Sequence, residues 1–167
     1  MTDTVGAILD AAERRIREAG YSGFSYREIA VDVGVKAASV HYHFPSKDTL
    51  AAAVAHRYND RVLEAVEAGM ASGLDAIQAW RAVFRDALRD GPRMCLCGAL
   101  GAASADLPPG VMVEVHRFFR SGLDSLRKAG LSEDRATQVM AVLEGAILMA
   151  TAQSDPEIFD RATAALD

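Results

Sequence analysis

The order of helix signals in the first 43 residues constrains the fold most. Apolar residues recur at helical spacing over residues 5–19. Ser25 is followed three residues later by Glu28, the capping-box pattern that starts a helix, and Gly34 is placed to end that helix. A second short helix is expected over residues 36–43. A longer helix followed by two short ones around a glycine-containing turn is typical of a helix-turn-helix.

Helical patterns continue to the end of the chain, and no segment has the alternation of a strand. Phe44-Pro45 interrupts the chain, and Ser46 is placed to cap a long helix from Lys47 to about Met70. Further helices are expected over residues 74–89, 93–104, 111–129 and 132–153, with a short one after Pro156. The sequence therefore predicts an all-α fold, with a three-helix module in domain 1–48 and a helical bundle in domain 49–167.

The net charge of the chain, −5 at neutral pH, is opposite in sign to that of most nucleic-acid binders. The segment from Lys36 to Lys47 nevertheless holds two lysines, two histidines and no acidic residue. A local basic patch is enough to gain affinity from DNA phosphates. Ala37, Ala38 and Ser39 are small, so the helix backbone is able to approach a major groove closely. We therefore expect residues 36–43 to form a recognition helix.

The stretch Ile29–Leu50, which reads IAVDVGVKAASVHYHFPSKDTL, resembles the DNA-binding signature of the TetR/AcrR family. The resemblance covers about residues 5–55, and beyond them the chain shares only the family's helical character. It implies a DNA-binding transcriptional regulator that binds a palindromic operator in double-stranded DNA as a homodimer. Such regulators are most often repressors that a small inducer releases from DNA.

The resemblance also implies which residues contact DNA: Ser25, Tyr26, Arg27, Lys36, Ala37, Ala38, Ser39, His41, Tyr42, His43 and Lys47. Residues 25–27 match phosphate-contacting positions, and residues 36–39 match positions that meet base edges. Thymine methyl groups are the expected partners of the two alanines. Tyr42 and His43 match groove-facing and phosphate-contacting positions, and Lys47 matches a phosphate-binding lysine at a helix start. His41 departs from the pattern, because the family often has tyrosine there.

The second half is expected to provide dimerisation. One apolar stripe at helical spacing is a candidate for a four-helix interface with a second copy. It consists of Val139, Val142, Leu143, Ala146, Ile147 and Ala150. The alternative is that this stripe faces the core of its own chain.

An inducer pocket is also expected in the second half. Its candidate lining residues are Tyr58, Trp80, Phe84, Met94, Cys95, Leu100, His116 and Phe119. Aromatic and methionine residues at helical spacing are more often ordinary core residues. The expected ligand is small and largely apolar, because no cluster of arginines indicates a multiply anionic one.

Cys95 and Cys97 are too close together for an ordinary structural disulfide, and the chain has no other cysteine. A thiol sensor of electrophiles or oxidants is one hypothesis for this pair. The alternative is close packing of small buried residues beside Gly98 and Gly101. A reduced, cytoplasmic protein is expected, with no secretory signal and no contact with a membrane.

Other functional classes are less well supported. The sequence has no phosphate-binding glycine loop, HExxH, nucleophile elbow or CxxC, so neither an enzyme nor a cofactor is expected. His41 and His43 lie two residues apart and diverge on a helix, so no metal site is expected. A helical partner-binding protein without DNA activity is the remaining alternative. The residues that argue against it are Lys36, Tyr42, His43 and Lys47.

Overall fold

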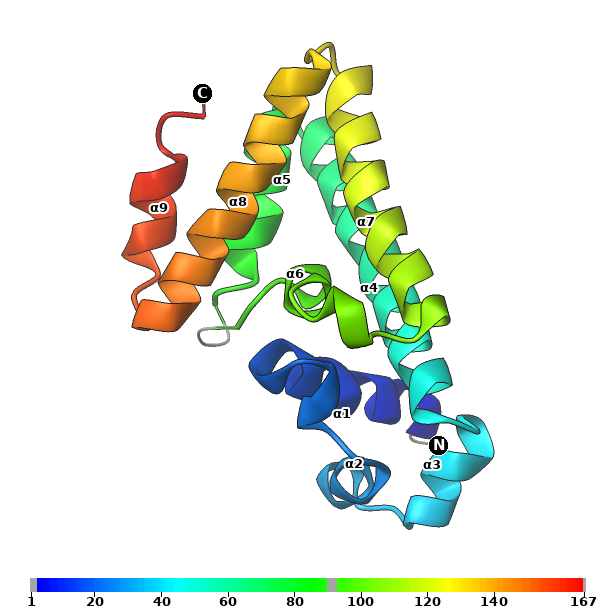
Figure 1. Cartoon of the computed structure of the whole chain (residues 1–167). Coiled ribbons are helices and arrows are strands. Elements are labelled where there is room, and N and C mark those ends of the chain that lie inside the picture. The colour runs from blue at the N-terminus through cyan, green and yellow to red at the C-terminus, as the bar shows by residue number, and fades with distance from the viewer. Residues whose placement is uncertain (1–2, 90–92, 167) are drawn as a thin grey trace. The chain divides into compact units, whose positions relative to one another are not determined.

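The computed structural model describes residues 3–89 and 93–166, and Figure 1 shows the arrangement of its helices. Within these residues the chain has no strand, which confirms the predicted all-α fold. The helices are α1 (Thr4–Ala19), α2 (Tyr26–Val33), α3 (Ala37–His43), α4 (Lys47–Ala71), α5 (Ala76–Asp86), α6 (Leu96–Gly101), α7 (Pro109–Lys128), α8 (Glu133–Gln153) and α9 (Glu157–Thr163). Two short 3₁₀ turns, Tyr21–Gly23 and Ser104–Asp106, lie between them.

Local capping explains where several helices begin. The Ser46 hydroxyl accepts a hydrogen bond of 3.2 Å from the backbone N–H of Thr49, as predicted for the start of α4. Asp75 and Gln78 form a reciprocal capping box at the start of α5. Pro109 occupies the first turn of α7, where its missing N–H costs no helical hydrogen bond.

Contacts divide the described chain into two compact units. The N-terminal unit consists of the residues up to Tyr58 together with Leu96–His116, and the C-terminal unit consists of Asn59–Cys95 and the residues from Arg117 onward. The expected functional boundary after residue 48 stays a prediction.

The core of the N-terminal unit lies along α1. Ile8 and Ile16 are fully buried, and α2 and α6 both pack against α1. On the surface of this unit, the Arg57 guanidinium donates a hydrogen bond of 2.7 Å to Asp10. This contact links α4 to α1 and so helps to fix the helix that follows α3.

Trp80 is at the centre of the C-terminal unit. Its ring is fully buried and lies 6.2 Å from the ring of Phe118, and its indole N–H donates to the Ser125 hydroxyl at 3.3 Å. Helix α8 packs against α5 and α9 in the same unit. An aromatic residue of this size contributes much of the apolar burial that holds such a bundle together.

The inner face of α8 carries most of the residues predicted for the dimer interface. Five of the six predicted interface residues are almost fully buried within the single chain: Val139, Leu143, Ala146, Ile147 and Ala150. Val142, the sixth, is only partly buried. This burial favours the alternative that the stripe faces the core of its own chain. The dimer interface stays a prediction.

Over the described residues, no helix is long and apolar enough to cross a membrane.

Candidate nucleic-acid interface

The turn between α2 and α3 is built around Gly34. Its φ of 75° lies in the left-handed region, which favours glycine. The following N–H, of Val35, donates to the Ala30 carbonyl at 2.9 Å and closes the end of α2. At the other end of α2, the Ser25 hydroxyl accepts from the Glu28 N–H at 3.3 Å, which confirms the predicted cap. Because it also donates to the Glu28 carboxylate at 2.8 Å, the Ser25 side chain is already engaged.

Helix α3 has one buried side and one open side. Val40 is fully buried and anchors the helix to the N-terminal unit. Ala37 and Ala38 are exposed, and so are His41, Tyr42 and His43 in the last turn. Tyr42 is 84% exposed, so its ring is open to a partner. This open side therefore presents small residues first and polar aromatic residues after them.

Tyr26 has a different position from the rest of the predicted contact set. It is buried, and its hydroxyl donates a hydrogen bond of 2.8 Å to the backbone carbonyl of Phe44. Its ring also lies 4.4 Å from that of His41. Burial raises the pKa of Tyr26 above its ordinary value, so the hydroxyl keeps its proton as a donor. Tyr26 therefore positions the end of α3.

Lys47 is fixed at the start of α4 by two aromatic rings. Its ammonium lies 4.8 Å from the ring centre of Tyr21 and 4.5 Å from that of Phe24, both within cation–π range. Partial burial lowers the pKa of Lys47. The Tyr21 hydroxyl donates to Asp48 at 2.5 Å, which fixes one of these rings in turn. The lysine is thereby held at the positive end of a long helix, a position suited to an anion.

Arg15 is a structural residue that the sequence reasoning did not select. Its guanidinium donates to both carboxylate oxygens of Asp32, at 2.6 and 3.0 Å, and to Glu28 at 3.2 Å. The hydrogen bond from Arg15 lowers the pKa of Asp32. The two acids are four residues apart and so lie on one face of α2. This spacing was the available sequence signal for a basic partner, and the bridge fixes α2 against α1.

The predicted contact set is mostly brought together on the surface of the N-terminal unit. Eight of its members are exposed: Ser25, Arg27, Lys36, Ala37, Ala38, His41, Tyr42 and His43. Ser39 and Lys47 are partly exposed, and Tyr26 is buried. The arrangement offers cationic and hydrogen-bonding side chains around a helix with small residues in its first turn, which is suited to a DNA groove.

Comparison with known proteins agrees with this geometry. The profile of bacterial regulatory proteins of the tetR family matches residues 8–54. A TetR transcriptional regulator from Legionella pneumophila is 27% identical, with a TM-score of 0.90 over 100% of this chain and 97% of the other. A regulator of the same family from Agrobacterium tumefaciens is 28% identical, with a TM-score of 0.87 over 96% and 94%.

Residues 8–54 match the DNA-binding region of the TetR family, and the chain has the fold of TetR regulators. It is a transcriptional regulator with a DNA-binding helix-turn-helix formed by α2 and α3. The reduced form of E. coli NemR has the same fold, with 21% identity and a TM-score of 0.81 over 99% of this chain and 96% of that one. A comparison with curated proteins gave no match.

The residues predicted for the inducer pocket of this TetR protein do not gather around one described cavity. Tyr58, Trp80, Phe84, Cys95 and Leu100 are buried, Met94 and Phe119 are partly buried, and His116 is exposed. Because Tyr58, Leu100 and His116 belong to the N-terminal unit and the others to the C-terminal unit, the set is divided between the two. Their role in ligand binding stays a prediction.

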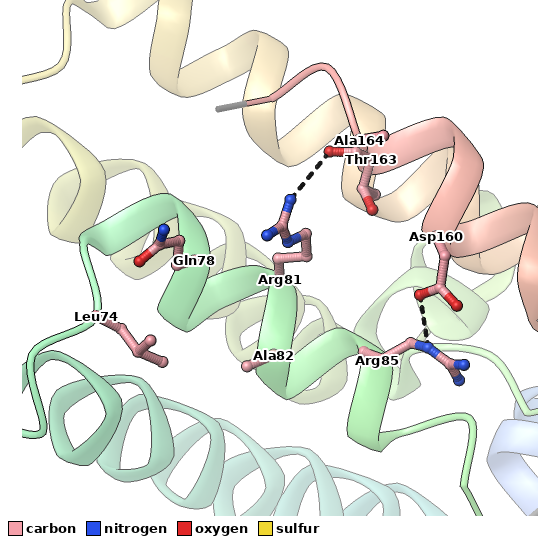
Figure 2. Close-up of a pocket in the computed structure, with 8 residues that line it drawn as sticks. All are labelled: Leu74, Gln78, Arg81, Ala82, Arg85, Asp160, Thr163 and Ala164. Carbon is pink, nitrogen blue, oxygen red and sulfur yellow. Dashed lines mark hydrogen bonds and ion pairs between the residues drawn. The ribbon is translucent and has the colours of Figure 1, made fainter.

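Two described cavities of the C-terminal unit have other linings. Figure 2 shows the larger, a groove of about 600 Å³ between α5 and α9. In it Arg85 donates to Asp160 at 2.6 Å and Arg81 donates to the Thr163 carbonyl at 3.4 Å. The second, of about 430 Å³, is lined by residues of α4 and α7 and by Ala129, which follows α7. None of the predicted pocket residues lines either cavity.

Neither Cys95 nor Cys97 is in a disulfide, and the two residues are 1% and 0% exposed. Reaction with an electrophile requires access to the thiolate, so this burial favours the packing interpretation over the sensor. Among the described residues, no group of three or more histidine, cysteine, aspartate or glutamate side chains is placed to hold a metal ion.

Proposed function

We propose that this TetR-family regulator is a homodimeric repressor that a small molecule releases from a palindromic operator. The observation that carries the proposal is the open side of α3, with its exposed Ala37, Ala38, Tyr42 and His43 on a helix that Val40 anchors. It acts by binding rather than by catalysis, in keeping with a family of regulators.

The proposed contacts divide by chemistry. Positive charge for the DNA phosphates comes from Arg27, Lys36 and Lys47. His43 donates a further hydrogen bond to the sugar-phosphate backbone of the DNA. Ala37 and Ala38 admit the helix into the groove and meet thymine methyl groups, while Ser39, His41 and Tyr42 face base edges or sugars. Tyr26 holds the end of α3 through Phe44 and does not itself need to reach DNA.

The proposed dimer uses the outer face of α8 in place of its buried stripe. Leu148 and Met149 are 53% and 51% exposed there. Ala141, Gly145 and Ala152 lie on the same side by helical spacing, and a side chain added at Gly145 would meet no atom within 4 Å. Two large apolar residues beside small ones allow a second helix to approach closely. A second copy of the chain is the proposed occupant, because a palindromic operator requires two recognition helices.

The inducer is proposed to be small and largely apolar and to bind in the C-terminal unit. Binding there changes the separation of the two recognition helices in the dimer, which lowers operator affinity. Any ligand that acts in this way must bind the released state more tightly than the DNA-bound state.

Selection of binding sequences from a random double-stranded library by the purified chain tests the proposal. We expect an enriched palindrome whose half-sites lie about 34–36 Å apart, bound by two chains and with an affinity that falls steeply as salt rises. Enrichment of no sequence, or of a single asymmetric site bound by one chain, would overturn the homodimeric repressor.

A further inference from the structure

Glu144 on α8 has a buried carboxyl group whose one described contact is with the Cys95 thiol, a weak hydrogen-bond donor. Each of its two oxygens has less than 1 Å² exposed and has no hydrogen-bond partner of normal geometry among the described residues. The partial exposure of the residue is therefore confined to its other atoms. An unpaired carboxyl in a protein interior is costly, and an apolar side chain of similar size would pack there at lower cost.

A second unsatisfied oxygen lies on the same side of α8. The Thr151 hydroxyl is also buried without a hydrogen-bond partner. Because seven residues make about two helical turns, Thr151 and Glu144 lie on one stripe of the helix, about 10 Å apart along its axis. A threonine hydroxyl in a helix usually donates a hydrogen bond to a carbonyl of the preceding turn. Buried polar groups without a good partner on one stripe of a helix therefore indicate a place where a bound ligand could supply the missing hydrogen bonds.

No charged group among the described residues is a cause of the pKa shift of Glu144. Met140 and Ile147, the neighbours one turn before and after, are buried and apolar. Burial raises the pKa of Glu144 to about 7, and the Cys95 thiol, a weak hydrogen-bond donor, lowers it only in part. Burial thus disfavours the charged form near neutral pH, and no cation among the described residues contributes to the pKa of the carboxyl group.

We propose that Glu144 is the anchor of a ligand site for a small organic cation, an amine or ammonium group with an apolar body. The cationic group pairs with the Glu144 carboxylate, the apolar body contacts the Met140 side, and the Thr151 hydroxyl is available to a polar substituent. This inference rests on the proposed function, since it names the chemical class of the inducer. An anionic ligand is excluded from the same site by charge.

Isothermal titration of the purified full-length chain tests the site with three probes of similar size. Benzyltrimethylammonium carries the charge, neopentylbenzene is its neutral isostere, and benzenesulfonate is an anion of similar size. We expect the cation to bind about tenfold or more tightly than the neutral isostere, and the anion not to bind, because removal of one partner of a buried charge pair is strongly unfavourable. Equal binding of the cation and the isostere, or no binding of the cation, would overturn the proposal.

Variants locate the effect within the chain. Glu144→Gln keeps the shape of the side chain and is expected to abolish the preference for the cation, whereas Glu133→Gln, at an exposed glutamate of the same helix, is expected to keep it. Between pH 6 and pH 8, wild-type affinity for the cation should rise about tenfold as the ionised fraction increases. A cation preference that survives in Glu144→Gln, or that does not vary with pH, contradicts the assignment.

Separate measurements of operator binding and of cation binding by the wild-type chain distinguish this proposal from the proposed function. If the wild-type chain binds its operator but no cation, only the ligand site fails. If the chain binds the cation through Glu144 but no operator, only the repressor proposal fails. A carboxyl satisfied by buried water alone would show neither cation binding nor a difference between the three probes.

Discussion

The hydroxyl of Tyr26 donates a 2.8 Å hydrogen bond to the carbonyl of Phe44 and so joins the first residue of α2 to the residue that ends α3. The recognition helix has only seven residues, and a helix of this length depends on tertiary contacts for its stability. Tyr26 supplies such a contact at the C-terminal end, and Val40 supplies another in the middle. The exposed side chains of α3 thus project from a helix fixed at both places.

Tyr26→Phe tests whether this tyrosine supports α3 or contacts DNA. The variant loses one partly buried hydrogen bond but keeps the ring contact with His41, so we expect a loss of about 1 kcal/mol in the free energy of unfolding. Urea unfolding measures this loss, and Tyr42→Phe, at an exposed tyrosine, is the matched control with unchanged stability. A large loss of operator affinity in Tyr26→Phe with no loss of stability would indicate a direct phosphate contact instead.

Leu148→Glu tests the outer face of α8 as the dimer interface. A charge placed in an apolar interface opposes association, so we expect sedimentation to show monomers and operator affinity to fall. Val113→Glu, at an exposed valine of α7, adds the same charge elsewhere and should leave the dimer intact. An unchanged dimer in Leu148→Glu would exclude this face.

The raised pKa of Glu144 predicts that the stability of the folded chain depends on pH in an unusual way. The pKa of Glu144 is raised from 4.5 to about 7 in the folded chain, so the folded state holds more protons than the unfolded state between these values. Stability should therefore fall as pH rises through this window, by up to about 3 kcal/mol, and the full penalty is present above pH 7. Glu144→Gln removes the penalty, so its stability relative to wild type should be greater at pH 8 than at pH 5. A constant difference between the two proteins over this range would refute the assignment.

Alkylation of the native protein tests the thiol-sensor hypothesis. Cys95 and Cys97 are buried, so mass spectrometry after brief exposure to iodoacetamide at neutral pH should find neither modified. Both should react after denaturation in urea, which serves as the positive control. Rapid modification of either cysteine in the native protein would restore the sensor hypothesis.

The features that the sequence predicted well depend on contacts between neighbouring residues. Ser25 and Ser46 cap helices through groups three residues away, and Gly34 is favoured because the turn needs a positive φ. Such signals lie within one turn of the chain. The recognition helix could be located from them, and the exposure of Tyr42 and His43 agrees with the prediction.

The features that the sequence did not predict depend on partners far along the chain. Arg15 reaches Asp32 across 17 residues, and Tyr26 reaches Phe44 across 18. The stripe of α8 shows the same limit, because helical spacing identifies an apolar face but not what covers it. Val139 and Leu143 therefore suited a dimer interface as well as a core, and their burial within their own chain favours the core.

The most direct test of the DNA-binding account is the operator affinity of Tyr42→Ala, measured by fluorescence anisotropy. Tyr42 is 84% exposed, so this variant should keep the stability and the oligomeric state of wild type. We predict a loss of affinity of about tenfold or more, equivalent to about 1.4 kcal/mol or more, because one side chain at the groove is removed from each recognition helix. Unchanged operator affinity in this variant would contradict the assignment of α3 as the helix that reads DNA.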